Sequence, residues 1–550
     1  MKRIIICFWM VVFAQLAWSG TFSFRHYSVE DGLSYNTVSS IIQDRHGFMW
    51  IGTENGLNRF DGYSFREYRS SRTGKNSMIS NLITSMLEDP SGNFWLGTDV
   101  GVYIFNPLKE EFEPFTIKTA DGSEINSIIN NIVQDKLGCI WISTYGQGVF
   151  SYNLKTKKLE QYNVLIEGMS SNRFDQVNQV YVDKKNNVWA ASKAPENPLL
   201  LFDRKSGSFR SFALKNKNFT VYKFFEDSQH NFWLGTWSRG ICKLNVSTGD
   251  VIPYLSPDQP GGIMHVHEIN EYKPGVLLLG SDDGLSLFNI YTQEHQLFRP
   301  SESDPASISD KFIYPIFKDH EGGFWIGTYF GGINYLSPNS GLFERYSHSR
   351  YINSVGGNVV GRFAEDKRGN IWIATDDGGL NVLNTKTGAF TSYLPKNGSN
   401  SISYHNVHAL CLDDDFLWIG TYSGGLNVLN TKTGKFRLYN SVDKDIKTLD
   451  GGSIYAIFRD KEKRIWLTSM TGVNLYNRTT DDFTRIKKFD VTTIDIKQDK
   501  KGYIWFATQG KGIYRLEPLS GKWKNYSSTD PSTGNIPTIR LTALPSIQTM

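Results

Sequence analysis

A tryptophan that recurs at a near-constant interval constrains the fold of this chain more than any other feature. Ten tryptophans mark successive units, and Leu278 fills the corresponding place between Trp233 and Trp325, which gives eleven units spaced 39 to 48 residues apart. The ten are Trp50, Trp95, Trp141, Trp189, Trp233, Trp325, Trp372, Trp418, Trp466 and Trp505. Such a period indicates a repeat architecture, in which one supersecondary unit is copied along the chain.

Each segment within a unit has the length and composition of a short β-strand. An apolar run ends in an acidic or amide residue followed by Asp, as at 41–44, and a turn with glycine follows. The second strand carries the tryptophan and ends in Gly-Thr, as at 94–98, and a Thr-Lys-Thr-Gly turn at 385–388 joins the third strand to a fourth. Four antiparallel strands per unit, with no helical periodicity between them, predict an all-β fold of the β-propeller class.

We expect the recurrent tryptophan and aspartate to have structural roles. The second strand is apolar on both of its alternating faces, as in Phe94-Trp95-Leu96, which is typical of a strand covered on both sides. Each indole should therefore pack between neighbouring blades, and each Asp should accept backbone N–H groups in its turn. Since one blade cannot bury its own faces, stability should depend on contacts with the next blade.

Eleven units are too many for a single ring, because about four to eight blades close a propeller. We expect a signal peptide at 1–19, a seven-bladed propeller at 20–347, an incomplete second propeller of four blades at 348–535 and an off-pattern tail at 536–550. The segment 22–27 would supply the strand that completes the first ring.

The N-terminal residues are typical of a secretory signal peptide. Lys2 and Arg3 precede an apolar run of 13 residues at 4–16, and the small residues Ala17 and Ser19 suit a signal-peptidase site. The run is short for a membrane-spanning helix, which needs about 20 residues. We therefore expect export to the periplasm, with an uncleaved membrane anchor as the alternative.

Charge and cysteine content exclude two further classes of protein. Lysine and arginine number 59 against 55 acidic residues, a net charge of +4, which is too balanced for a surface that coats nucleic acid. Four cysteines in 550 residues exclude a disulfide scaffold. Cys139, Cys242 and Cys411 lie in apolar, strand-like stretches and are predicted to be buried free thiols.

Two neighbouring segments carry a resemblance to a known family. Residues 27–34 read Tyr-Ser-Val-Glu-Asp-Gly-Leu-Ser, and residues 47–53 read Gly-Phe-Met-Trp-Ile-Gly-Thr. Both closely resemble the two-component regulator propeller repeats, and the resemblance extends from about residue 22 to residue 526. It implies the periplasmic sensor region of a hybrid two-component sensor kinase in polysaccharide utilisation, in which two propellers detect oligosaccharides. The parts that follow in that family (a β-sandwich, a membrane helix, a kinase, a receiver and a DNA-binding regulator) have no counterpart, so we expect a truncated member without kinase residues.

The loops between second and third strands suggest a ligand site. In propellers these loops emerge on the same face as the loops between blades, and exposed rings there can stack on sugars while polar groups bind hydroxyls. The candidates are Tyr145, Trp237, Arg239, Tyr329, Phe330, Asp376, Asp377 and Tyr422, with Gln509 at the same position in the last unit. The alternative is that these rings only pack over neighbouring loops.

The resulting functional prediction is an oligosaccharide-binding sensor module without cofactor or catalytic residues. The alternatives are a secreted hydrolase or lyase that acts on polysaccharides, and a protein-interaction scaffold. His265 and His267 could form a metal pair, but no third ligand is evident, and no metal is predicted. The acidic run 413–415 lacks the spacing of a calcium loop and predicts a solvated turn. For a protein partner, a homodimer and a separate sensor kinase chain both remain open.

Overall fold

The computed structural model describes residues 22–69, 78–162, 176–216, 218–339, 345–349, 353–397, 400–442, 445, 447–488 and 492–527. The predicted signal peptide and the off-pattern tail lie outside these residues. Within them the chain forms eleven four-stranded antiparallel sheets and one short 3-10 helix, η1 (Val29–Asp31). The prediction of an all-β fold of the propeller class is confirmed. No helix among these residues has the length and apolar character needed to cross a membrane.

The chain divides into two compact units, Met1–Glu344 and Arg345–Met550, and each is described by itself. Unit 1 contains sheets 1 to 7. Sheets 1 to 3 consist of β2–β5 (Val38–Gln43, Met49–Thr53, Gly56–Phe60, Phe65–Tyr68), β6–β9 (Ser85–Glu88, Phe94–Thr98, Gly101–Asn106, Glu111–Pro114) and β10–β13 (Ile129–Gln134, Cys139–Thr144, Val149–Asn153, Leu159–Tyr162). Sheets 4 to 6 consist of β14–β17 (Val177–Val182, Val188–Ser192, Leu199–Asp203, Ser208–Ser211), β18–β21 (Val221–Glu226, Phe232–Thr236, Ile241–Asn245, Asp250–Tyr254) and β22–β25 (Glu268–Lys273, Val276–Ser281, Gly284–Asn289, His295–Phe298). Sheet 7 consists of β26–β28 (Ile313–Lys318, Phe324–Thr328, Ile333–Leu336) together with β1 (Phe24–Tyr27).

Unit 2 contains sheets 8 to 11. Their strands are β29–β32 (Val360–Glu365, Ile371–Thr375, Leu380–Asn384, Ala389–Tyr393), β33–β36 (Val407–Asp413, Phe416–Thr421, Leu426–Asn430, Lys435–Tyr439), β37–β40 (Ile454–Arg459, Ile465–Ser469, Gly472–Asn477, Asp482–Lys488) and β41–β44 (Thr493–Gln498, Ile504–Thr508, Ile513–Glu517, Lys522–Tyr526). The first strand of each sheet contacts the first strand of the next, in the order β29, β33, β37 and β41.

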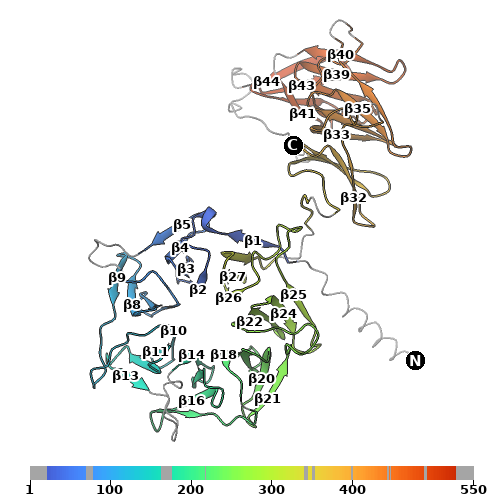
Figure 1. The fold of residues 1–550 in the computed structure, drawn as a ribbon. Coiled ribbons are helices and arrows are strands. Elements are labelled where there is room, and N and C mark those ends of the chain that lie inside the picture. Colours follow the sequence, from blue (N-terminus) through green and yellow to red (C-terminus); the bar gives the residue numbers. More distant parts are fainter. Residues whose placement is uncertain are drawn as a thin grey trace. The chain divides into compact units, whose positions relative to one another are not determined.

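The seven sheets of unit 1 form a closed ring (Figure 1). The first strand of each sheet is innermost and contacts the first strand of the following sheet, and β26 of sheet 7 contacts β2 of sheet 1. The N-terminal strand β1 pairs antiparallel with β28, with Phe24 opposite Leu336 and Tyr27 opposite Ile333. The segment expected to complete the ring therefore does so as the outermost strand of sheet 7, and it joins the two ends of the ring through backbone hydrogen bonds.

The recurrent indoles lie between adjacent sheets, as predicted. Trp50 of sheet 1 is 1% exposed, and its ring lies 4.8 Å from that of Phe94 and 5.5 Å from that of Phe105, both in sheet 2. Other clusters of buried residues likewise join the tryptophan of one sheet to apolar residues of the next. Each sheet thus supplies the apolar surface that covers its neighbour.

The recurrent aspartate holds both the turn and the indole. In sheet 1, Asp44 Oδ1 accepts the backbone N–H groups of His46 (2.8 Å) and Phe48 (3.0 Å), while Oδ2 accepts the indole N–H of Trp50 (2.8 Å). The first role confirms the sequence prediction, and the second was not foreseen. The same indole bond links Trp95 to Asp89, Trp141 to Asp135, Trp189 to Asp183, Trp233 to Asp227, Trp325 to Asp319, Trp372 to Asp366, Trp466 to Asp460 and Trp505 to Asp499.

Sheet 9 departs from this arrangement, and the solvated turn predicted at 413–415 is wrong for its first residue. Asp413 is only 5% exposed and forms ion pairs with Arg459 (2.8 Å) and Arg478 (2.7 Å) of sheet 10. It precedes Trp418 by five residues instead of six, and the buried indole nitrogen of Trp418 has no hydrogen-bond partner among the described residues. In this shorter turn the Asp413 carboxylate therefore pairs with arginines of the next sheet and does not accept the indole N–H of Trp418.

The three cysteines of the described chain are free thiols. Cys242 is buried, as predicted, and burial raises its thiol pKa to about 12. Cys139 and Cys411, which were predicted to be buried, are only partly buried. Burial raises both of their thiol pKa values as well, so none of the three has the character of a reactive thiolate.

Candidate ligand-binding face of unit 1

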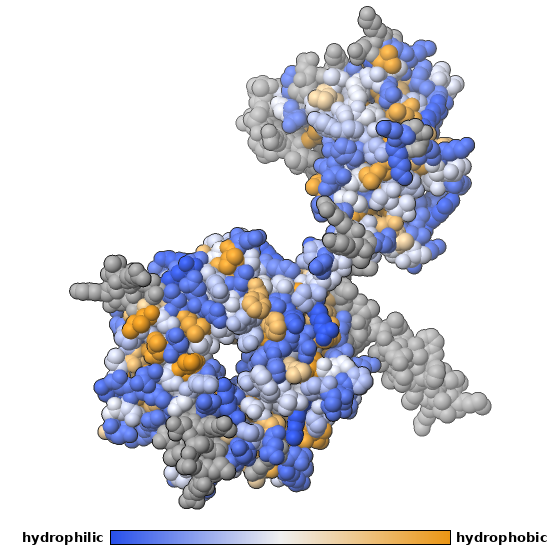
Figure 2. Space-filling model, viewed as in Figure 1, coloured by the Kyte–Doolittle hydropathy of each residue, from blue (hydrophilic) through white to orange (hydrophobic). Residues whose placement is uncertain are grey.

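Four of the residues predicted from the sequence lie at one end of the unit 1 ring. Tyr145, Trp237 and Tyr329 directly follow the second strands of sheets 3, 5 and 7, and each donates its backbone N–H to the carbonyl that precedes the innermost strand of the same sheet. Their exposed fractions are 43%, 44% and 36%, and that of the neighbouring Phe330 is 63%. These side chains are therefore accessible at the end of unit 1 where the inner strands begin. Figure 2 shows one face of unit 1 with the central opening of its ring.

Six rings form a continuous arc across sheets 5, 6 and 7, which we call the aromatic arc. The Trp237 ring lies 3.6 Å from that of His265 and 5.3 Å from that of Tyr222. His267 stacks on Tyr314 at 4.5 Å with an interplanar angle of 11°, and Tyr314 lies 5.7 Å from Tyr329. The arc thus consists of Tyr222, Trp237, His265, His267, Tyr314 and Tyr329.

A carboxylate lies at the centre of the aromatic arc. Asp282, which directly follows β23, accepts hydrogen bonds from His265 Nδ1 and from His267 Nε2, the latter at 2.8 Å. Burial pushes the pKa of Asp282 upward, but the two imidazole hydrogen bonds outweigh it and hold that pKa below its usual range. Burial lowers the pKa of His267, against the opposing effect of Asp282. At neutral pH His267 is therefore a neutral imidazole that donates from Nε2 and offers Nδ1 as an acceptor.

Two rings of the arc come from β-bulges that the sequence analysis missed. Tyr222 lies where the register of β18 against β19 shifts, and Tyr314 lies at the corresponding shift of β26 against β27. Sheets 1, 3 and 4 have a polar residue at this position, namely Ser39, Asn130 and Asn178. The side chain of each donates a hydrogen bond to a backbone carbonyl of the following sheet, at or shortly before the start of its inner strand. An aromatic residue at the second position of an inner strand was therefore the sequence signal that could have identified Tyr222 and Tyr314 as members of the arc.

Two other predicted residues of unit 1, Tyr145 and Arg239, each take part in a contact between a cation and a ring. The Lys193 ammonium of sheet 4 lies 4.2 Å from the centre of the Tyr145 ring, and burial lowers the pKa of Lys193. The Arg239 guanidinium lies over the ring of Phe219, 4.8 Å from its centre, and takes no part in the arc. Tyr145 and Lys193 thus pair an exposed ring with a cation, whereas the Arg239 guanidinium covers the ring of Phe219.

Unit 2 contains a smaller group around His408. The His408 ring lies 5.5 Å from that of Tyr422 and 5.3 Å from that of Tyr455, and Asp376 Oδ1 lies 3.8 Å from His408 Nε2. Asp377, in contrast, accepts the backbone N–H of Asn358 at 3.1 Å and anchors a loop. The eight predicted residues are therefore divided between two units, and the structure groups Asp376 and Tyr422 in unit 2 separately from the arc of unit 1.

A recurrent asparagine in the third strand fixes the loops that lead into the sheets. In sheet 9, Asn427 Oδ1 accepts the backbone N–H of Ser403 (3.0 Å), and Asn427 Nδ2 donates to the Ser403 hydroxyl (2.7 Å). Asn58, Asn334, Asn381 and Asn474 accept the equivalent backbone bond in sheets 1, 7, 8 and 10. Buried amides thus position the loops that lead into the inner strands of these five sheets.

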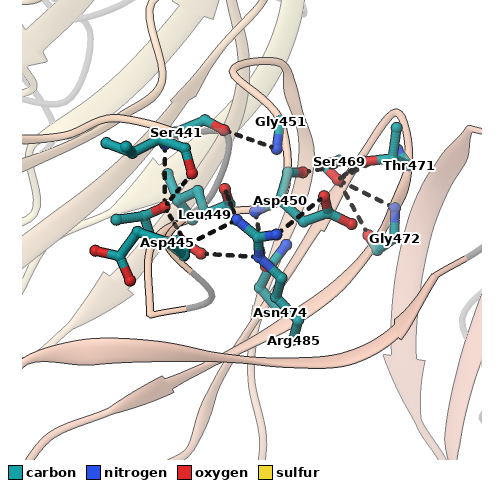
Figure 3. A network of polar contacts seen from close by, with 12 residues as sticks. Ser441, Asp445, Leu449, Asp450, Gly451, Ser469, Thr471, Gly472, Asn474 and Arg485 are labelled. Carbon is teal, nitrogen blue, oxygen red and sulfur yellow. Dashed lines mark hydrogen bonds and ion pairs between the residues drawn. The ribbon is translucent and has the colours of Figure 1, made fainter.

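Figure 3 shows the loop of sheet 10, where an arginine contributes to this anchoring. Arg485 Nη2 donates to the carbonyls of Asp445 (3.0 Å) and Leu449 (3.2 Å), and its Nη1 lies 3.9 Å from Asp450 Oδ1. Asn474 accepts the Asp450 backbone N–H at 3.0 Å, but its buried Nδ2 has no partner among the described residues. The guanidinium therefore carries much of the loop anchoring that the amide alone provides in sheet 9.

The two histidines that could have formed a metal pair bind a carboxylate instead. His265 and His267 both donate to Asp282, and among the described residues no group of three His, Cys, Asp or Glu side chains is placed to hold a metal ion. A separate cleft of about 520 Å³ lies between sheets 2 and 3 and is lined by Trp95, Phe115 and Tyr152. Because it includes the turn before β7, it opens at the opposite ends of the strands from the aromatic arc.

The chain is similar to one histidine kinase in sequence and to extracellular domains of known structure. A chain segment of 67 residues is 39% identical to histidine kinase P4 of Formosa agariphila and spans 12% of this chain and 5% of that protein. The extracellular domain of a hybrid two-component system from B. thetaiotaomicron is 24% identical, with a TM-score of 0.59 over 92% of this chain and 67% of that chain. A second extracellular domain from the same organism is 20% identical, with a TM-score of 0.48 over 93% of this chain and 74% of that chain.

A family model matches the repeats directly. The model described as the two component regulator propeller matches residues 32–55, 77–100 and 123–146 of unit 1 and residues 354–377 of unit 2. Where the structure describes these segments, they contain the turn or loop before a sheet and its first two strands, which carry the Asp and Trp of the repeat. The chain therefore contains segments that match the two-component regulator propeller repeat, three in unit 1 and one in unit 2.

Proposed function

We propose that this chain is the ligand-sensing module of a two-component signalling system and that the aromatic arc of unit 1 binds an oligosaccharide. The observation that carries the proposal is the arc itself, in which exposed rings surround the Asp282 carboxylate and the His267 imidazole. Sugar rings present apolar C–H faces that can stack on aromatic side chains, and their hydroxyls can bond to the polar groups at the centre.

The repeat family and the histidine kinase relative support a role in signalling. In this proposal the propeller lies in the periplasm after export, and the bound state is read by another part of a longer protein or by a separate kinase chain. The closed ring suits such a role, because the arc draws residues from three sheets whose relative positions the ring fixes.

Ring truncation in the arc tests the binding site. We expect Trp237→Ala and Tyr329→Ala each to weaken oligosaccharide binding about fivefold, since losing one stacking contact of about 1 kcal/mol changes the dissociation constant by about that factor. Isothermal titration calorimetry with a panel of neutral and acidic oligosaccharides of glucose, galactose, xylose and uronic acids measures the change. Unchanged affinity in both variants would contradict the proposal.

Tyr63→Ala is the matched control, because Tyr63 is 96% exposed and lies between β4 and β5, away from the arc. It should bind like the unmodified protein. Chromatography of the oligosaccharide after incubation separates the functions: a sensor leaves it intact, whereas a hydrolase or lyase shortens it. Failure of every oligosaccharide to bind, with capture of an envelope protein instead, would favour the scaffold.

A further inference from the structure

The cleft between sheets 2 and 3 lies where arginine side chains occupy the preceding junction, between sheets 1 and 2. In that junction the Arg45 backbone N–H donates to Glu88 Oε2 at 3.1 Å, and the Arg45 guanidinium donates to the Asp89 carbonyl at 2.7 Å. Arg66 forms an ion pair with Glu110, which lies in the turn between β8 and β9. The corresponding space between sheets 2 and 3 is a cleft of about 520 Å³.

The sequence of sheet 2 explains why this junction is open. Three arginines of sheet 1 have shorter residues in their places, and all three of these replacements line the cleft. They are Pro90 for Arg45, Ile104 for Arg59 and Glu113 for Arg66. Because proline has no backbone N–H, Pro90 cannot donate to sheet 3 in the way that Arg45 donates to Glu88 of sheet 2.

Two polar side chains of sheet 3 that line the cleft have no hydrogen-bond partner among the described residues. The first is the amide of Gln134, which stands in the place of Glu88. The second is the hydroxyl of Tyr152, a residue that is only 4% exposed. Burial raises the pKa of Tyr152, so its hydroxyl stays protonated and can both donate and accept. A ligand in the cleft can supply the hydrogen bonds that these two groups lack.

A carboxylate and an ammonium flank the cleft without pairing. Glu113 and Lys157 occupy the places of Arg66 and Glu110, so the two charges are exchanged relative to the preceding junction. Arg66 and Glu110 form an ion pair, whereas Glu113 and Lys157 are exposed and pair with no charged group in the part of the chain that the structure describes. A carboxylate only accepts hydrogen bonds and an ammonium only donates them, while a hydroxyl does both. The two charges together therefore suit a ligand with several hydroxyls.

Aromatic rings supply the apolar wall of the cleft. The Phe115 ring lies 5.1 Å from that of Tyr152, with an interplanar angle of 82°, and 5.0 Å from that of Trp95. Trp95 is 3% exposed, whereas Phe115 is half-buried and lines the cleft with part of its ring accessible. An apolar wall with a few polar groups, in a space of about 300–1,000 Å³, is the usual design of a small-ligand site.

We propose that this cleft is a second binding site of unit 1 and that it takes one sugar residue, either free or at the end of a chain. The C–H face of the sugar lies on Phe115, and its hydroxyls bond to Gln134 and Tyr152 on one side and to Glu113 and Lys157 on the other. The cleft and the aromatic arc lie at opposite ends of the strands. The inference therefore does not rest on the function proposed for the arc.

Hydrogen–deuterium exchange of the full chain, read by mass spectrometry, locates the bound sugar. The probes are the methyl glycosides of glucose, galactose, mannose, xylose, arabinose, fucose and glucuronic acid, each at millimolar concentration. We expect at least one of them to slow exchange in peptides that cover 89–93, 113–117 and 134–138. The same protection should appear in Trp237→Ala, in which the arc is damaged. Protection that is absent with every glycoside, or that disappears in Trp237→Ala, would overturn the second site.

Variants at exposed positions keep the test independent of folding. Glu113→Gln should weaken binding of the protecting glycoside about fivefold, because charge-assisted hydrogen bonds are roughly twice as strong as neutral ones. Pro90→Arg should abolish the protection, because it restores the backbone N–H and the guanidinium that occupy the preceding junction. Glu321→Gln is the matched control, since Glu321 is exposed in the corresponding turn of sheet 7 and should bind like the wild type. Unchanged binding in both Glu113→Gln and Pro90→Arg would contradict the proposed site.

Discussion

At the residue scale, the environment of His267 gives the candidate site a defined response to acid. Burial depresses the pKa of His267 in the folded chain, so as pH falls through the ordinary histidine range, near 6.5, the unfolded chain takes up a proton before the folded one does. Folded stability is therefore lost on acidification. Asp282 acts in the same direction at lower pH, because its carboxyl pKa is also held down in the fold.

We expect His267→Gln to flatten the pH dependence of unit 1 stability between pH 7 and pH 5, an interval about the ordinary histidine pKa. The glutamine amide can still donate to Asp282 but does not titrate. Chemical denaturation of both proteins across this interval measures the difference. His408 also has a burial-lowered pKa and stays in both proteins, so it cancels in the comparison. Equal slopes for the two proteins would show that His267 titrates alike in the folded and unfolded chains.

The residues of the repeat differ in how far sequence could predict them. The tryptophan and the turn aspartate were predictable because strand period and turn chemistry leave few alternatives for an apolar residue between sheets and an acceptor in a tight turn. The six-residue spacing from Asp44 to Trp50 recurs in nearly every unit and could have suggested their hydrogen bond. The Asp413 ion pairs could not be predicted in this way, because Arg478 is 65 residues away in sequence.

At the element scale, the asparagine of the third strand offers a matched pair of sites. Asn427 makes two hydrogen bonds to Ser403, whereas Asn474 accepts one from Asp450 and leaves its Nδ2 unpaired among the described residues. Removing the Asn427 side chain therefore leaves more buried polar groups without a hydrogen-bond partner than removing that of Asn474. We expect Asn427→Ala to lower the free energy of unfolding of unit 2 by about 1–3 kcal/mol, and Asn474→Ala by less.

Urea denaturation of the two variants measures this difference, and the side-chain volume removed is the same in both. Arg485→Ala should also destabilise unit 2, since Arg485 anchors the loop that Asn474 holds only in part. If Asn474→Ala were the more damaging of the two asparagine variants, the unpaired amide would not explain the weaker anchoring.

The aromatic arc could be predicted from the sequence only in part. Trp237 and Tyr329 directly follow strands that the repeat locates, whereas Tyr222 and Tyr314 lie at β-bulges that the repeat does not reveal.

At the scale of the whole molecule, ring closure should decide the stability of unit 1. Strand β1 supplies the outer edge of sheet 7, and Tyr27 stacks on Trp325 at 5.7 Å while also lying 5.1 Å from Phe60 of sheet 1. These contacts bridge the two ends of the ring. Since each sheet is stable only against its neighbours, loss of this bridge should weaken more than sheet 7 alone.

Deleting residues 22–27 should therefore lower or abolish the unfolding transition of unit 1 and leave that of unit 2 unchanged. Differential scanning calorimetry, with limited proteolysis to assign each transition, distinguishes the units. Arg25→Ala is the control, because Arg25 is an exposed residue of β1 whose loss keeps the strand and its pairing. A deletion that left both transitions in place would mean that the contact between β26 and β2, together with the hydrogen bond from the His320 backbone N–H to Gln43 Oε1, closes the ring without the terminal strand.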